Sequence, residues 1–171
     1  MTGLKHWHLR PQTNFYPKKN FERVISGIPD GSTVIFMFGE IDCREGILEA
    51  VEKDRYDSIE EGIEFTIMIF IRALRALRSR NFKSFVHPVI PVLNETRQMV
   101  TKYNHRFREK VNAEPDLVWM DGIFENLLDP RGKLKKEYEL DGILIIHPLL
   151  PYLPLSSPHS QAHIFTRIIS H

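Results

Sequence analysis

Thr33-Val34-Ile35-Phe36-Met37-Phe38 is an unbroken run of apolar residues, mostly β-branched or aromatic, and Gly39 closes it. Such a run predicts a strand that is buried on both faces, which is typical of a parallel sheet. Two further apolar runs follow, over residues 85–90 and 117–120. The sequence therefore predicts three strands of one mostly parallel sheet.

Amphipathic helices separate these runs. The clearest covers residues 58–80, where Ser58 and Glu61 form a capping box and apolar residues recur at helical spacing. A second helix is predicted over 95–112, and shorter ones over 18–26 and 123–128. Strands that alternate with helices predict an α/β domain with helices on both faces of the sheet.

The N-terminal region shows a weaker pattern. Leu4 to Leu9 alternates apolar and polar residues, which predicts a short, half-buried strand. His6 and His8 would share one face of that strand and, with Glu40 or Asp42, they could bind a metal. Structural and surface histidines are far commoner than ligands, so we expect no metal and no other cofactor.

Length and composition restrict the class of protein. The chain has 171 residues, a formal net charge of +1 and a single cysteine, Cys43. We expect one domain over 1–153, followed by a loosely ordered tail over 154–171. The near-neutral charge argues against nucleic acid as a partner, and a single cysteine excludes an intrachain disulfide. The longest apolar run, 65–71, is too short to span a bilayer and no signal peptide is visible, so we expect a cytoplasmic protein.

The polar residues that follow the predicted strands form the candidate site, because ligands of such folds bind beyond the carboxyl ends of the strands. Two roles stay open for Asp42. Arg44 or helix N-terminal amides could stabilise its free carboxylate, or Asp42 could cap a helix that begins near Arg44. The candidates are Gly39, Glu40, Asp42 and Arg44 after the first strand, Asn94, Glu95 and Arg97 after the second, Asp121 after the third, and Asp141 and His147 further on.

The heptapeptide Phe38-Gly39-Glu40-Ile41-Asp42-Cys43-Arg44, with the later dipeptide Asp141-Gly142, resembles the SGNH, or GDSL-type, hydrolase superfamily. More narrowly, it is similar to a branch with a Gly-Glu-Ile-Asp-Cys-Arg signature. The resemblance runs from about His8 to Pro148. It implies a flavodoxin-like three-layer α/β/α sandwich that cleaves acyl or acetyl esters of sugars or lipids. It also implies a serine nucleophile, a late Asp-x-x-His motif and an oxyanion site.

The resemblance assigns roles to particular residues and also reveals departures from the family pattern. The chain has no Gly-Asp-Ser block, it has Ile41 in place of the oxyanion asparagine, and it has Leu144 where Asp-x-x-His requires histidine. These departures predict an N-terminally truncated chain whose sheet lacks the first, central strand of the family. The assigned residues are Asp141 as orienting acid, His147 as base, and Gly39, Glu40, Asp42 and Arg44 in the substrate and oxyanion region.

Two functions are consistent with this sequence. The first is an ester hydrolase, or an inactive remnant of one, that acts on a small-molecule, glycan or lipid ester. The second is a non-catalytic pseudoenzyme or binding domain that retains the pocket. Loss of a triad member costs roughly four to six orders of magnitude in rate, so the missing serine favours the second function for this chain.

Overall fold

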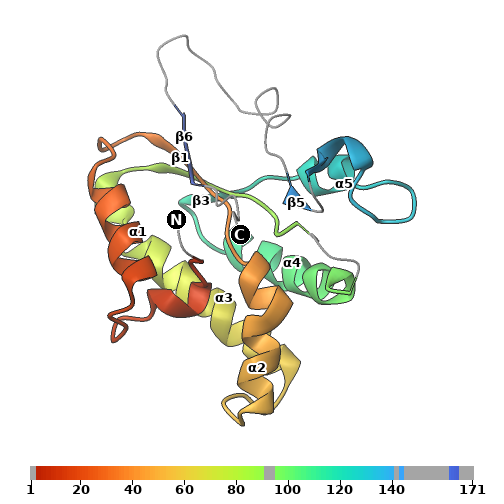
Figure 1. Ribbon diagram of the computed structural model, residues 1–171. Coiled ribbons are helices and arrows are strands. Elements are labelled where there is room, and N and C mark those ends of the chain that lie inside the picture. Colours follow the sequence, from red (N-terminus) through yellow and green to blue (C-terminus); the bar gives the residue numbers. More distant parts are fainter. Residues whose placement is uncertain (1–2, 91–94, 141–142, 145–161, 166–171) are drawn as a thin grey trace.

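The computed structural model of the chain describes residues 3–90, 95–140, 143–144 and 162–165, and it has a mixed α/β architecture (Figure 1). The helices are α1 (Tyr16–Ser26), α2 (Ile47–Glu52), α3 (Ile59–Arg75), α4 (Arg97–Asn112) and α5 (Ile123–Leu127). Short helical turns are η1 (His6–Leu9), η2 (Asp42–Gly46), η3 (Arg78–Arg80) and η4 (Lys136–Tyr138). The strands are β1 (Thr33–Phe36), β2 (Lys83–Val86), β3 (Leu117–Trp119), β4 (Glu139–Leu140), β5 (Ile143–Leu144) and β6 (Ala162–Phe165).

The main sheet has four strands in the order β3-β2-β1-β6, and every neighbouring pair is parallel. Val34 of β1 stands opposite Ser84 of β2 on one side and opposite His163 of β6 on the other. β4 and β5 form a separate antiparallel pair. The predicted parallel sheet is therefore confirmed for its three expected strands. A fourth strand, β6, comes from the segment over 154–171 and pairs with β1 on the side opposite β2.

The strand predicted over Leu4 to Leu9 is wrong, because η1, a 3-10 helix, occupies His6–Leu9. His6 and Leu9 are both buried and lie three residues apart, which is the repeat of a 3-10 helix. The alternating pattern counted His6 as polar and outward, but its ring lies in the core. His6 and His8 consequently do not share the face of a strand.

α3 begins as its sequence predicts. The Ser58 hydroxyl accepts a hydrogen bond from the Glu61 N–H at 3.1 Å, which satisfies one of the free amides of the first turn. The Glu61 carboxylate accepts from the Asp57 N–H at 2.6 Å, one residue before the position that a capping box requires. The helix ends at Arg75, and a turn at 76–77 followed by η3 forms the rest of the segment predicted over 58–80.

Both faces of the sheet are covered by apolar side chains, as the unbroken apolar runs predict. Alternate residues of the strands point to opposite faces. On one face, Val34, Phe36, Val86 and Trp119 join the large core formed with α1, α3 and α4. On the other face, Ile35 and Phe85 pack with Met120, Leu127 and Leu134. Figure 1 shows α3 and α4, which contact one another, below the strands, with α5 to the right of the sheet.

The arginines at the end of α3 and in η3 connect elements of the fold. Arg75 Nε and Arg78 Nη2 each donate to Oε2 of Glu114 at 2.9 Å, and these arginines hold the pKa of Glu114 below its usual value. Arg80 donates to the carbonyl oxygen of Ile28 at 2.5 Å, just beyond the end of α1. None of the helices that the structure describes is long and apolar enough to cross a membrane.

Candidate functional site

Gly39 lies three residues beyond the end of β1, at the carboxyl edge of the sheet. Its φ is +110°, a backbone conformation that residues with a side chain rarely adopt. A Cβ at this position would lie 2.7 Å from Cγ2 of Val89, in the loop after β2. Glycine is therefore required here both for the turn and for the close approach of the two loops.

A helix with an unusual turn follows Gly39. Helical backbone begins at Glu40, passes through the π turn η2 and continues into α2. π turns inside helices are rare and occur frequently at functional sites. Because helical backbone already starts at Glu40, Asp42 lies within the first turn and does not cap a helix that begins near Arg44.

The Asp42 side chain is buried and points to the N-terminal segment of the chain. Its Oδ2 accepts a hydrogen bond from the His6 N–H at 2.8 Å, and its Oδ1 accepts from the Trp7 N–H at 3.4 Å. Burial raises the pKa of Asp42 to about 7, although these two amide hydrogen bonds act in the opposite direction. Of the two roles considered for Asp42, stabilisation by helix N-terminal amides is the one observed, and the helix is η1.

Glu40 and Arg44 form a partly exposed ion pair on the surface of this helix. Arg44 Nη1 lies 3.4 Å from Glu40 Oε1, and Nη2 lies 3.4 Å from Glu45 Oε1. Arg44 is thus engaged by two carboxylates of its own helix, whereas the Asp42 carboxylate is held by main-chain amides.

A buried His6–Tyr103 pair lies behind the turn. His6 Nδ1 is 2.6 Å from the Tyr103 hydroxyl, and the His6 ring stacks on Phe70 with a centroid distance of 4.1 Å. Burial lowers the pKa of His6 to about 3 and raises the pKa of Tyr103, so both side chains are neutral at pH 7. The simplest arrangement has the hydroxyl donate to Nδ1. His6 Nε2 then carries the proton and has no partner among the residues that the structure describes.

Asn104 fixes the loop that follows β2. Its Oδ1 accepts from the Val89 N–H at 2.8 Å, and its Nδ2 donates to the Val89 carbonyl at 2.7 Å. The same loop carries His87, whose Nδ1 lies 2.7 Å from the Pro88 carbonyl and whose pKa burial lowers to about 4. Both side chains therefore support the carboxyl edge and do not face solvent.

The described serines mostly have local structural roles. The hydroxyls of Ser26 and Ser32 donate to carbonyl oxygens three residues earlier, at 2.8 Å and 2.6 Å, and Ser58 caps α3. Ser84 is buried within β2. In residues 3–90, 95–140, 143–144 and 162–165, no three His, Cys, Asp or Glu side chains are grouped so that they could hold a metal ion.

Sequence reasoning placed some of these residues correctly and missed others. Gly39, Glu40, Asp42 and Arg44 do follow the central strand, whereas Asp141 and His147, with Asn94, lie outside the described residues. The partners of Asp42 were not identified, because the amides of His6 and Trp7 lie 36 and 35 residues away in the chain. No local spacing indicates contacts of that kind.

Comparison with protein-family models, curated proteins and solved structures finds no match to this chain.

Proposed function

We propose that this chain is an SGNH-type domain with a flavodoxin-like three-layer arrangement, and that the carboxyl edge of its sheet binds an acyl or acetyl ester. The observation that carries the proposal is the Gly39 turn at the end of β1. It combines a positive φ, close contact with the loop after β2, and a π turn that follows at once. Parallel α/β sheets bind their ligands at this edge.

Polar groups suited to an ester lie at the same edge. The Glu40–Arg44 pair is partly exposed, so its guanidinium can donate hydrogen bonds to a carbonyl oxygen. In the proposed hydrolysis water is the nucleophile. His147 removes its proton as the water oxygen bonds to the ester carbonyl carbon, and returns that proton to the alkoxy oxygen, which leaves as the alcohol when its bond to the carbonyl carbon breaks. Asp141 fixes the tautomer of that histidine. The donor that replaces the missing oxyanion asparagine would then be Arg44 or a main-chain amide of the turn.

The second candidate is an ester-binding domain without turnover. The engagement of Ser26, Ser32 and Ser58 in local hydrogen bonds favours it, because none of these hydroxyls is available as a nucleophile. Asp42 is likewise used to hold η1, and its burial keeps its carboxylate away from a ligand.

A chromogenic acetyl or butyryl ester distinguishes the two candidates. The hydrolase predicts turnover that falls by roughly 10⁴-fold in Asp141→Ala. A matched control is Asp116→Ala, which removes an exposed carboxylate just before β3, at the opposite edge of the sheet, that pairs with Arg78, and this variant should retain the rate. Saturable binding of the ester without turnover supports the binding domain. A folded chain that neither binds nor hydrolyses any of these esters refutes the proposal.

A further inference from the structure

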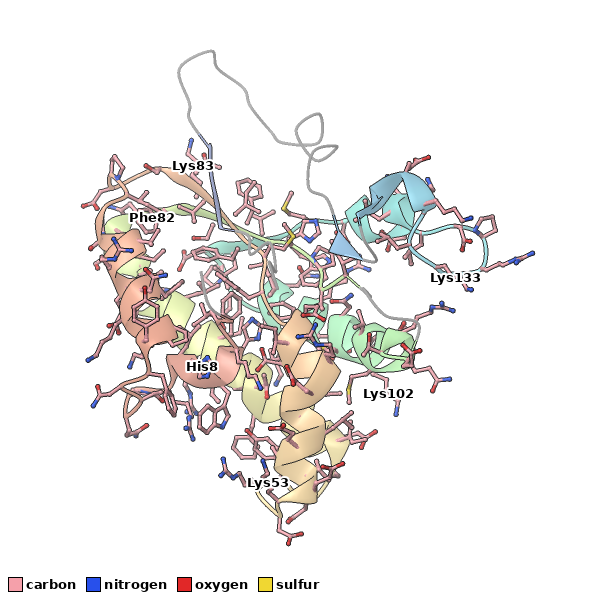
Figure 2. The ribbon with its side chains drawn as sticks, viewed as in Figure 1. His8, Lys53, Phe82, Lys83, Lys102 and Lys133 are labelled. Atoms are coloured by element: carbon pink, nitrogen blue, oxygen red, sulfur yellow. The ribbon has the colours of Figure 1, made fainter. Side chains whose placement is uncertain are left out.

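A pocket of about 210 Å³ lies between η1 and the end of α2. Figure 2 shows two of its residues, His8 on η1 and Lys53 just after α2, on the same lower side of the molecule. The lining residues are Lys5, Trp7, His8, Gly46, Glu49, Ala50, Lys53 and Arg55.

The lining is predominantly cationic. It contains three basic side chains and one carboxylate, and that carboxylate, on Glu49, pairs with Lys53 at 3.6 Å. Lys5 and Arg55 have no carboxylate within 4.0 Å in the part of the chain that the structure describes. Two of the three cations therefore form no ion pair with a described carboxylate, although Lys5 also acts at longer range on the buried Asp42 carboxyl, whose pKa it lowers.

The positive charge is also evident in the neighbouring histidine. Burial lowers the pKa of His8, and the charges of Lys5 and Arg10 lower it further. A hydrogen bond with the backbone of Gly3 raises this pKa but does not outweigh them. Lys5 lies over the bare backbone of Gly46, where a Cβ would be 3.5 Å from Lys5 Cδ and 3.8 Å from Nζ. The ammonium thus has space beside it that a side chain at position 46 would reduce.

Trp7 connects this pocket to a second, more open hollow of about 650 Å³. The Arg10 guanidinium covers the Trp7 ring at 3.4 Å, and Phe15, which is 50% exposed, lies 5.9 Å from Trp7. Gln12, Thr13 and Asn14 complete the lining. The second hollow therefore offers ring surface directly beside the cationic pocket.

We propose that the pocket between η1 and α2 binds the phosphate group of a phosphate monoester whose organic part lies against Trp7 and Phe15. Ammonium and guanidinium groups together present several donors, which suits a tetrahedral oxyanion with a charge near −2. The exposed Phe15 ring and the uncovered part of the half-buried Trp7 ring give the organic part an apolar surface. The site uses neither Asp141 nor His147, so the proposal stands independently of the proposed ester site.

The indole N–H signals in a ¹H–¹⁵N spectrum of the full chain test this proposal. The chain has two tryptophans, Trp7 in the site and the buried Trp119, and Trp7→Phe assigns the two signals. Phenyl phosphate, added at constant ionic strength, should shift the Trp7 signal saturably and leave the Trp119 signal unchanged. It should bind roughly tenfold more tightly than inorganic phosphate, because its ring is removed from water.

Charge-removing variants show whether the pocket is responsible. Lys5→Gln with Arg55→Gln should weaken the binding of phenyl phosphate about tenfold. The matched control is Lys83→Gln with Lys133→Gln, which removes the same charge from residues labelled far from the pocket in Figure 2 and should leave binding unchanged. The conservative pair Lys5→Arg with Arg55→Lys should retain most of the affinity.

Three results would overturn the proposal. One is the absence of any shift at Trp7 in a chain whose backbone spectrum is that of the folded protein. Another is equal weakening by both charge-removing pairs, which would indicate a long-range effect of net charge. The third is benzoate binding as tightly as phenyl phosphate, which would mean that the pocket selects a singly charged carboxylate.

Discussion

Replacing Asp42 with asparagine should change how the stability of the fold depends on pH. The unfolded carboxyl group titrates near 3.8, and in the folded chain burial raises its pKa to about 7. Between these values the native state holds a proton that the unfolded state has lost, so a rise in pH favours unfolding. A pKa difference of about three corresponds to about 4 kcal/mol of stability that is lost as the pH rises from 4 to above 7.

Buried histidines act in the opposite direction in the same range. Burial lowers the pKa of His6 to about 3 and that of His87 to about 4, so the folded state excludes protons that the unfolded state binds. Their contribution to stability is lost as the pH falls from about 6.5 through those values. In the wild-type chain Asp42 offsets about half of this increase with pH, because its pKa change of about three opposes two histidine pKa changes of about three each. Asp42→Asn removes the offset, and stability should then rise steeply from pH 4 to 7.

Urea unfolding of both proteins at several pH values measures this effect. The free energy of unfolding of Asp42→Asn minus that of the wild type should increase by about 4 kcal/mol between pH 4 and 7.5. Asp42→Asn also removes the acceptor of the Trp7 N–H, and this changes the free energy of unfolding by an amount that does not vary with pH. The control is Asp54→Asn, which replaces an exposed carboxylate. It shows how much of the change in stability comes from removing any one carboxylate. A difference that is the same at every pH would refute the assignment of a protonated, buried Asp42.

Further predictions concern the carboxyl edge of the sheet. Gly39→Ala should destabilise the fold by about 3 kcal/mol, because a Cβ meets Val89 Cγ2 at 2.7 Å and the φ is +110°. Gly31 also has a positive φ but has open space around it, so Gly31→Ala should cost about 1 kcal/mol in the same urea titration. Equal losses of stability in the two variants would argue against the contact between a Cβ at position 39 and Val89. Asn104→Ala should cost about 3 kcal/mol, because it leaves the N–H and C=O of Val89 without their partner. Thermal unfolding should show almost no change for the exposed control Asn112→Ala, and a similar shift in both variants would contradict the role of Asn104.

How much of the fold the sequence could predict depends on how far apart along the chain the contacting residues lie. The run over 33–38 predicted a strand buried on both faces, and Val34 and Ile35 indeed pack into different cores. The helix over 58–80 was recognised because its cap and its apolar repeat are both local. The strand over 85–90 was placed too late, since β2 ends at Val86, before a proline that cannot donate to a ladder.

The candidate site was harder to predict than the fold. Position after a strand identified Gly39 and Asp42, but their functions depend on residues from distant parts of the chain. His6 was assigned to a strand because a histidine scores as polar, whereas its stacking on Phe70 depends on α3. The roles assigned to Asp141 and His147 stay predictions, because both residues lie outside the described part of the chain.

The hydrogen bonds from Asp42 to the amides of His6 and Trp7 also determine how the N-terminal segment opens. They close a loop of about 36 residues that contains α1 and β1. Loop closure of this length costs entropy, and the buried contacts of Leu4, His6 and Leu9 contribute to offsetting it. Native-state hydrogen exchange should therefore find that the amides at positions 6 and 7 exchange together as one cooperative unit, ahead of the amides of α3.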